Sequence, residues 1–120
     1  PRPAPVREQR VPERAAAAML SAAQIRQDAI ANQLQGDLQE QLAGLDAARQ
    51  QETLIRTSLL PQAELTFQAA LASYQTGRVD FTTLLDAQRQ MRRARFDQLK
   101  ALLEQRLRLT EIERLVGAPL

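Results

Sequence analysis

Residues 74–89 read YQTGRVDFTTLLDAQR, and this stretch predicts a reversal of direction between two long helices. Gly77 suits the position just past a helix end, where a positive φ costs glycine nothing. Asp80 suits the N-cap of the next helix, because its carboxylate can accept the backbone N–H of Thr82 or Thr83. The stretch therefore contains a helix stop followed closely by a helix start.

A hydrophobic staple is also predicted at this reversal. Val79 and Leu84 stand at the N′ and N4 positions around Asp80, the spacing at which two apolar side chains fix the entry of a helix. The residues alone thus indicate a tight antiparallel αα-hairpin with its tip at 77–80.

The composition favours slender helices over a compact globule. Aromatic residues make up only 3% of the 120 residues, which is enough chain for one domain, whereas alanine and leucine are abundant. Small apolar residues on long periodic segments are typical of bundles and coiled coils. The net charge of +2 argues against an electrostatic partner for the chain as a whole.

The chain lacks the residues that most catalytic and metal sites need. It has no cysteine and no histidine, which excludes disulfides, thiolate chemistry and imidazole ligands. Soft metal ions would find only Met19 and Met91, which lie far apart in sequence. No glycine-rich phosphate loop is present either, so we expect no metal site, no cofactor and no enzymatic activity.

The first helix is predicted from about residue 12 to residue 76. Pro12 fits a first helical turn, where its missing N–H is no loss. The steps of four, four and three from Leu34 to Leu45 form an eleven-residue period, which indicates a nearly straight helix. Its apolar stripe is expected to comprise Ile30, Leu34, Leu38, Leu42, Leu45, Glu52, Ile55 and Leu59.

Two places could interrupt this helix. Gly36 and Asp37 followed by Glu40 imitate a helix stop and a capping box, but the leucine phase runs through them without spare residues, so we favour continuity. Pro61 removes a backbone hydrogen bond and clashes with the preceding turn. Leu60 would be a poor N-cap, so a kink near Pro61 is expected rather than a clean break.

The second helix is predicted from about residue 81 to residue 116. Its end is marked by Arg114 in the last turn, Gly117 after it and Pro119 beyond. The fold class is therefore all-α: a long, coiled-coil-like antiparallel helical hairpin over 12–117. An extended segment at 1–11 and a tail at 118–120 flank it.

The two helices differ in length, and this difference predicts self-association. A helix of about 65 residues spans about 97 Å, whereas one of about 36 residues spans about 54 Å. The second helix can cover the first only from roughly Gln41 onward. The apolar stripe before Glu40 then lacks a partner in this chain, so isolated chains are expected to associate with one another.

A basic run on the second helix could suggest nucleic-acid binding, but a solvated or inter-helix face is favoured. Nucleic-acid binding would require stacking aromatics near the arginines, and only Phe96 is close. Asp86 and Asp97 flank the run, which fits ion pairing on the helix surface. The run consists of Arg89, Arg92, Arg93 and Arg95.

The stretch at 74–89 resembles the TolC-like outer-membrane efflux proteins, whose last long hairpin carries Tyr-x-x-Gly and then Leu-Leu-Asp-Ala-Gln. LLPQAE at 59–64 and EIERLVG at 111–117 resemble the branch that exports heavy-metal ions. The resemblance covers nearly the whole chain, as the last portion of a much longer protomer.

This resemblance implies a protomer that trimerises into an outer-membrane β-barrel continued by a periplasmic α-helical barrel in a Gram-negative cell envelope. The hairpin would belong to that α-barrel, and 1–11 would be the remnant of a strand exit. The implied partners are two further copies, a periplasmic adaptor (membrane fusion) protein and an inner-membrane resistance-nodulation-division pump. No nucleic acid is implied.

The resemblance also implies roles for residues of the tip. Tyr74 matches a tyrosine at the closed periplasmic end, and Asp86 matches an aspartate that lines the pore entrance. Val79 and Thr83 depart from the pattern, because the family's namesake has an arginine and a second pore aspartate there. The segment expected to dock the adaptor comprises Thr76, Gly77, Arg78, Val79 and Asp80.

A different class of function is the alternative: a free-standing helical-hairpin interaction or scaffold module, such as the hairpin of a periplasmic adaptor. The gene sequence upstream of Pro1 discriminates the two. Amphipathic strands after a signal peptide would favour the efflux duct, whereas lipoyl-like β-segments would favour an adaptor.

Overall fold

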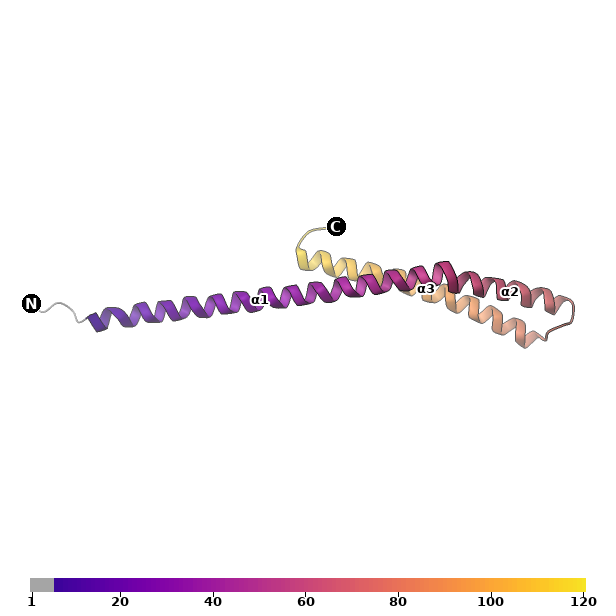
Figure 1. Cartoon of the computed structure of the whole chain (residues 1–120), viewed down its shortest axis with the longest axis horizontal. Coiled ribbons are helices and arrows are strands. Elements are labelled where there is room, and N and C mark those ends of the chain that lie inside the picture. Colours follow the sequence, from indigo (N-terminus) through magenta and orange to yellow (C-terminus); the bar gives the residue numbers. More distant parts are fainter. Residues whose placement is uncertain (1–5) are drawn as a thin grey trace, which may run out of the picture. The chain divides into compact units, whose positions relative to one another are not determined.

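The computed structural model describes the backbone of residues 6–120 and the side chains from Arg10 onward. Within that range the chain is helical and has no strand. Its elements are α1 (Val6–Leu54), the π-helical turn η1 (Ile55–Leu59), α2 (Leu60–Gln75) and α3 (Phe81–Val116) (Figure 1). The chain divides into two compact units, residues 1–38 and residues 39–120.

The first helix begins earlier than the sequence suggested. Residues 1–11 were expected to be extended, but α1 starts at Val6, and Pro12 therefore lies inside the helix rather than in its first turn. Glu8, Gln9 and Arg10 have high helix propensity, which favours an additional turn before the proline. The remainder of that expectation, residues 1–5, lies outside the described residues.

Gly36 does not interrupt α1, which confirms the expected continuity. The helix runs through Gly36 and Asp37. The side-chain amide of Gln33 donates to Oδ1 of Asp37 at 3.0 Å, so Asp37 takes part in an exposed pair within the helix instead of capping a new one.

Pro61 lies just after a π-helical turn, whereas the sequence predicted a kink near this residue. The backbone N–H of Leu60 donates to the carbonyl oxygen of Ile55, five residues earlier, instead of four. Both flanking residues, Leu54 and Leu60, keep right-handed helical dihedrals, so the chain does not break. Proline cannot supply an N–H to a regular α-helical ladder, and a widened turn just before it is one way to adjust that ladder.

In the unit formed by residues 39–120, α2 and the end of α1 pack against α3 in antiparallel directions (Figure 1). The buried core is small, and half of its members are alanines. Its members are Leu45, Ala48, Ile55, Ala70, Ala87, Met91, Ala101 and Ile112. Alanine lets the helix axes approach closely, but each such contact buries little apolar area.

The face of α3 toward the other helices follows a regular 3.5-residue repeat. Alternating steps of four and three connect its four buried residues and four of its half-buried ones, the spacing of a coiled-coil seam. We call this set the α3 seam: Ala87, Met91, Ala94, Gln98, Ala101, Gln105, Arg108 and Ile112. The coiled-coil-like hairpin expected from the sequence is thus present.

Polar contacts fix how far α3 reaches along α1. The side-chain amide of Gln98 donates to Oε1 of Glu52 at 3.2 Å, and Nη1 of Arg108 donates to Oε1 of Gln41 at 3.1 Å. The guanidinium of Arg108 lies over Gly44, where an added Cβ would come within 2.6 Å of it. The pairing of α3 with α1 therefore reaches at least as far as Gln41.

Many large apolar side chains remain exposed. In the unit of residues 1–38 they are Val11, Met19, Leu20, Ile25, Ile30 and Leu34, with exposed fractions between 43% and 72%. Leu59, expected on the buried stripe, is also exposed, and the π turn accounts for its position, as argued below. No helix in the described part of the chain is long and apolar enough to cross a membrane.

Candidate functional site

The reversal between α2 and α3 begins with a Schellman motif. The N–H of Arg78 donates to the carbonyl of Ser73 at 2.8 Å, and the N–H of Gly77 donates to the carbonyl of Tyr74 at 3.0 Å. Gly77 has a φ of 73°, in the left-handed region that disfavours residues with a Cβ. The hydroxyl of Thr76 donates to the carbonyl of Ser73 at 3.1 Å and completes this end. The expected helix stop is confirmed.

Asp80 caps the start of α3, as expected. Its Oδ1 accepts the backbone N–H of Thr83 at 2.9 Å and the hydroxyl of Thr83 at 2.7 Å. The hydroxyl bond and then the backbone bond stabilise the carboxylate, and they lower the pKa of Asp80 below its ordinary value of 3.8. Val79 and Leu84 are both half-buried, as expected for a staple.

Tyr74 lies beside the reversal and packs against Phe81 at the first position of α3. The two ring centroids are 6.0 Å apart at an interplanar angle of 63°, an edge-to-face arrangement. Tyr74 keeps 42% of its surface exposed. The pair joins the last turn of α2 to the first turn of α3, and the exposed part of the tyrosine remains accessible to a further chain.

Asp86 is separate from this aromatic pair. Its side chain is 59% exposed and lies 3.9 Å from Nη1 of Arg89, one turn further along α3. Such a long, exposed ion pair contributes little to stability. The structure thus brings Tyr74 together with the tip at 76–80, but it does not bring Asp86 into contact with either.

Three arginines of the basic run pair with carboxylates. Arg89 pairs with Asp86, Arg93 with Asp97 at 3.2 Å, and Arg95 reaches across to Glu64 of α2 at 3.5 Å. These pairs confirm the expectation of a solvated and inter-helix charged face. The absence of nucleic-acid binding stays a prediction.

A second apolar surface lies on α3, away from the α3 seam. Each of its members is between 43% and 65% exposed, although all are large and apolar. We call this set the outer face of α3: Phe96, Leu99, Leu102, Leu103 and Leu107. Exposed apolar residues gathered on one helix face are typical of a surface that another chain covers.

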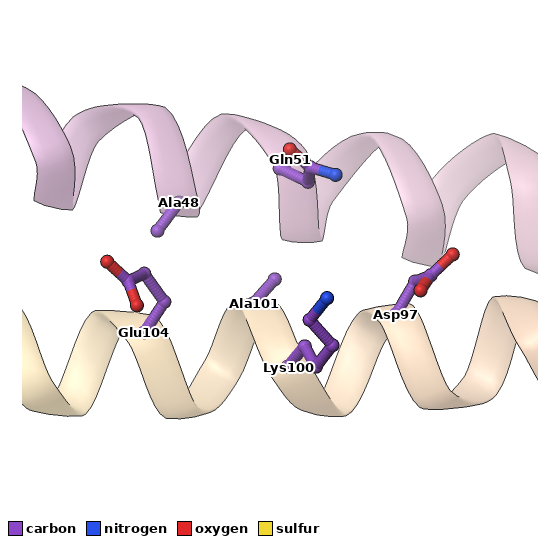
Figure 2. A pocket seen from close by; sticks show the side chains of 6 residues that line it. All are labelled: Ala48, Gln51, Asp97, Lys100, Ala101 and Glu104. Atoms are coloured by element: carbon purple, nitrogen blue, oxygen red, sulfur yellow. The ribbon is translucent and has the colours of Figure 1, made fainter.

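A hollow on the side of the hairpin, next to Ala48 and Ala101, is open rather than enclosed. Ala48 and Ala101 approach each other from the two helices there, with Asp97, Lys100 and Glu104 of α3 around them (Figure 2). The hollow, about 250 Å³, is an open space left by small seam residues. Charges of both signs at its rim, without a buried polar group, suit water rather than a specific ligand.

No cluster of three or more acidic side chains able to hold a metal ion occurs among the described residues. Met19 is 72% exposed in the unit of residues 1–38, whereas Met91 is buried in the core of the other unit. The two potential soft ligands therefore lie in different environments.

Comparisons with protein-family models, with curated proteins and with solved structures find no match for the chain.

Sequence reasoning missed two features of this region. Phe81 was not singled out, although its position seven residues after Tyr74 across a short reversal could have suggested the ring contact. The π turn was also missed. The repeat of apolar residues before Ile55 and the repeat after Leu60 differ by one residue, and this shift could have suggested it.

We predict that Gly77→Ala lowers the thermal unfolding midpoint, because a Cβ at a φ of 73° costs about 1–2 kcal/mol. Gly36→Ala is the matched control. Gly36 lies inside α1 with open space around a Cβ, so the same substitution should stabilise the helix by about 0.5–1 kcal/mol. Circular dichroism melts of both variants test the pair, and equal shifts of the same sign would contradict the tip geometry.

We also predict a pH-dependent contribution from Asp80. Because the folded-state pKa is depressed, the stabilisation is fully present at neutral pH and is lost as the pH falls below about 3.8 and through the lower folded value. Asp80→Asn keeps a capping oxygen but removes the titration. The stability difference between wild type and this variant should shrink on acidification in chemical-denaturation curves, and a difference independent of pH would refute the assignment.

Proposed function

We propose that this chain forms part of the periplasmic α-helical barrel of a trimeric, TolC-like outer-membrane efflux duct, with heavy-metal cations as its expected cargo. In this proposal an inner-membrane pump of the resistance-nodulation-division type drives export, and a periplasmic adaptor protein joins pump and duct. The chain itself acts as a passive wall. Its helices shift at the tip to open or close the passage.

The observation that carries this proposal is the angle between the two apolar faces of α3. At about 100° per residue, the outer face of α3 points roughly 150° away from the α3 seam. A compact bundle places the apolar positions of each helix on the one side that faces the common core. Faces on nearly opposite sides suit a helix with a neighbour on each side in a gently curved layer, as in the wall of a wide barrel.

The first unit supports the same interpretation independently. Large apolar residues from Val11 to Leu34 are exposed on a helix that needs a partner to bury them. A chain with unpartnered apolar surface in both units is suited to assembly with copies of itself or with other parts of a longer protomer.

The tip has properties that suit docking. The backbone N–H groups of Gly77, Arg78 and Thr83 bond locally, through the Schellman motif and Asp80, and these bonds stabilise the turn within the chain. Gly77 and Arg78 are exposed at its end, and Gly77 has open space around it. Together with the resemblance of 74–89, this favours 76–80 as the segment that meets the adaptor.

Tyr74 and Asp86 are the proposed gate residues. The exposed part of Tyr74 can bond to a neighbouring helix pair, and that bond would hold the passage closed. Asp86 is exposed, and three symmetry-related copies at a narrow entrance would concentrate cations by focusing their field. Cations would be attracted to this entrance, whereas no tight metal site is required of the wall.

We expect the isolated chain to self-associate through the outer face of α3. Leu99→Gln combined with Leu103→Gln should weaken association at least tenfold, because each leucine contributes about 1.5–3 kcal/mol when fully buried. Arg93→Gln is the control, because Arg93 is exposed and lies about 100° around the helix from the outer face of α3. Sedimentation velocity and helicity measurements decide the outcome, and a wild-type chain that stays monomeric at high concentration would contradict the prediction.

The tip assignment is tested in the complete, membrane-assembled protein. Gly77→Trp should abolish metal resistance while trimers still assemble, because a bulky ring blocks the adaptor surface. Gly77→Asn is the control, since asparagine tolerates the left-handed conformation and stays small. Retained resistance with tryptophan, or equal loss with asparagine, would count against a docking tip.

A further inference from the structure

The buried stripe on the long helix changes phase by one residue at the π turn. From Gln41 to Ile55, the three buried residues and two of the half-buried ones follow alternating steps of four and three, as in α3. We call them the upper seam: Gln41, Leu45, Ala48, Glu52 and Ile55. A 3.5-residue repeat of this kind requires each next member at a fixed position.

The same alternating steps, continued past Ile55, lead to residues that do not pack against α3. They reach Leu59, Gln62, Thr66 and Ala69, all of which are exposed.

Positions one residue later are the ones that pack. We call them the lower seam: Leu60, Ala63, Phe67 and Ala70, which are half-buried or buried. The stripe has therefore gained one residue between Ile55 and Leu60, and Leu59 is exposed for this reason.

The π turn η1 supplies that residue. The bond from the N–H of Leu60 to the carbonyl of Ile55 spans five residues, so the turn holds one more residue than an α-helical turn. Without it, α2 would be rotated by about 100° about its axis, and Gln62 and Thr66 would face the core in place of Ala63 and Phe67. Pro61 lies two residues after the π turn, and it has no N–H to donate to the hydrogen bonds of a regular α-helix.

We propose that the π turn Ile55–Leu59, with Pro61, positions the tip by setting the rotation of α2. The next position of the lower seam after Ala70 is Tyr74. The centroids of the Tyr74 and Phe81 rings are 6.0 Å apart. The rotation fixed at η1 is thus carried about 25 Å along a rigid helix to the tyrosine. The presentation of Tyr74 to a partner rests on the proposed function, but its rotation in this chain does not.

The test removes one residue at the turn and, as a control, one residue beyond it. The first variant lacks Leu59 and carries Pro61→Ala, which should give an uninterrupted α-helix with both seams in phase. The second lacks Ala69 and keeps Pro61, so the π turn is retained and Tyr74 is turned by about 100°. The two chains have equal length.

The chain has one tyrosine and no tryptophan, so tyrosine signals report this site alone. In the variant without Leu59 we expect the nuclear Overhauser contacts between the rings of Tyr74 and Phe81 to persist, with unchanged helicity. In the variant without Ala69 they should be lost, with a lower melting midpoint.

Loss of the ring contacts in both variants, or retention in both, would overturn the proposal. Unfolding of the variant without Leu59 would overturn it as well, because an in-phase helix is expected to fold. Neither readout depends on export or on an adaptor, so the result is independent of whether the proposed efflux function holds.

Discussion

In residues 39–120, α3 is one uninterrupted helix, and both the end of α1 and α2 pack along it. The packing of this unit depends on that continuity. The α3 seam keeps a 3.5-residue repeat from Ala87 to Ile112. The segment opposite must present a matching stripe along its whole length, because alanine contacts tolerate no gap. The long helix meets this requirement by adding one residue at the π turn, so an irregularity in one helix preserves regular packing in the pair.

The same helix explains where polar residues enter the contact. Gln98 and Arg108 belong to the α3 seam and reach Glu52 and Gln41 on the other helix. Their hydrogen bonds fix the axial register of a seam that alanines alone would specify weakly. Gly44 provides the space that lets the arginine lie across the helix.

Much of the fold could be predicted from sequence because it depends on local rules. Gly77 and Asp80 have strong positional preferences, and both adopt the conformations expected of them. The start of α1 could not be predicted from Pro12, because the polar helix formers before the proline extend the helix past it. The π turn was missed because one apolar stripe was extended through Leu59, whereas the phase is set by pairing with α3. Site roles depend on partner chains, and those roles stay proposals.

The alanine-rich core also shapes the thermodynamics of a single chain. The heat capacity of unfolding scales with the apolar surface that unfolding exposes. A core with few large buried side chains beside its alanines exposes little such surface. The stability curve of an isolated hairpin is therefore broad and shallow with temperature. A strongly curved dependence of the unfolding free energy on temperature would indicate that more apolar surface is buried than in the isolated hairpin. Calorimetry could therefore detect association that buries the outer face of α3.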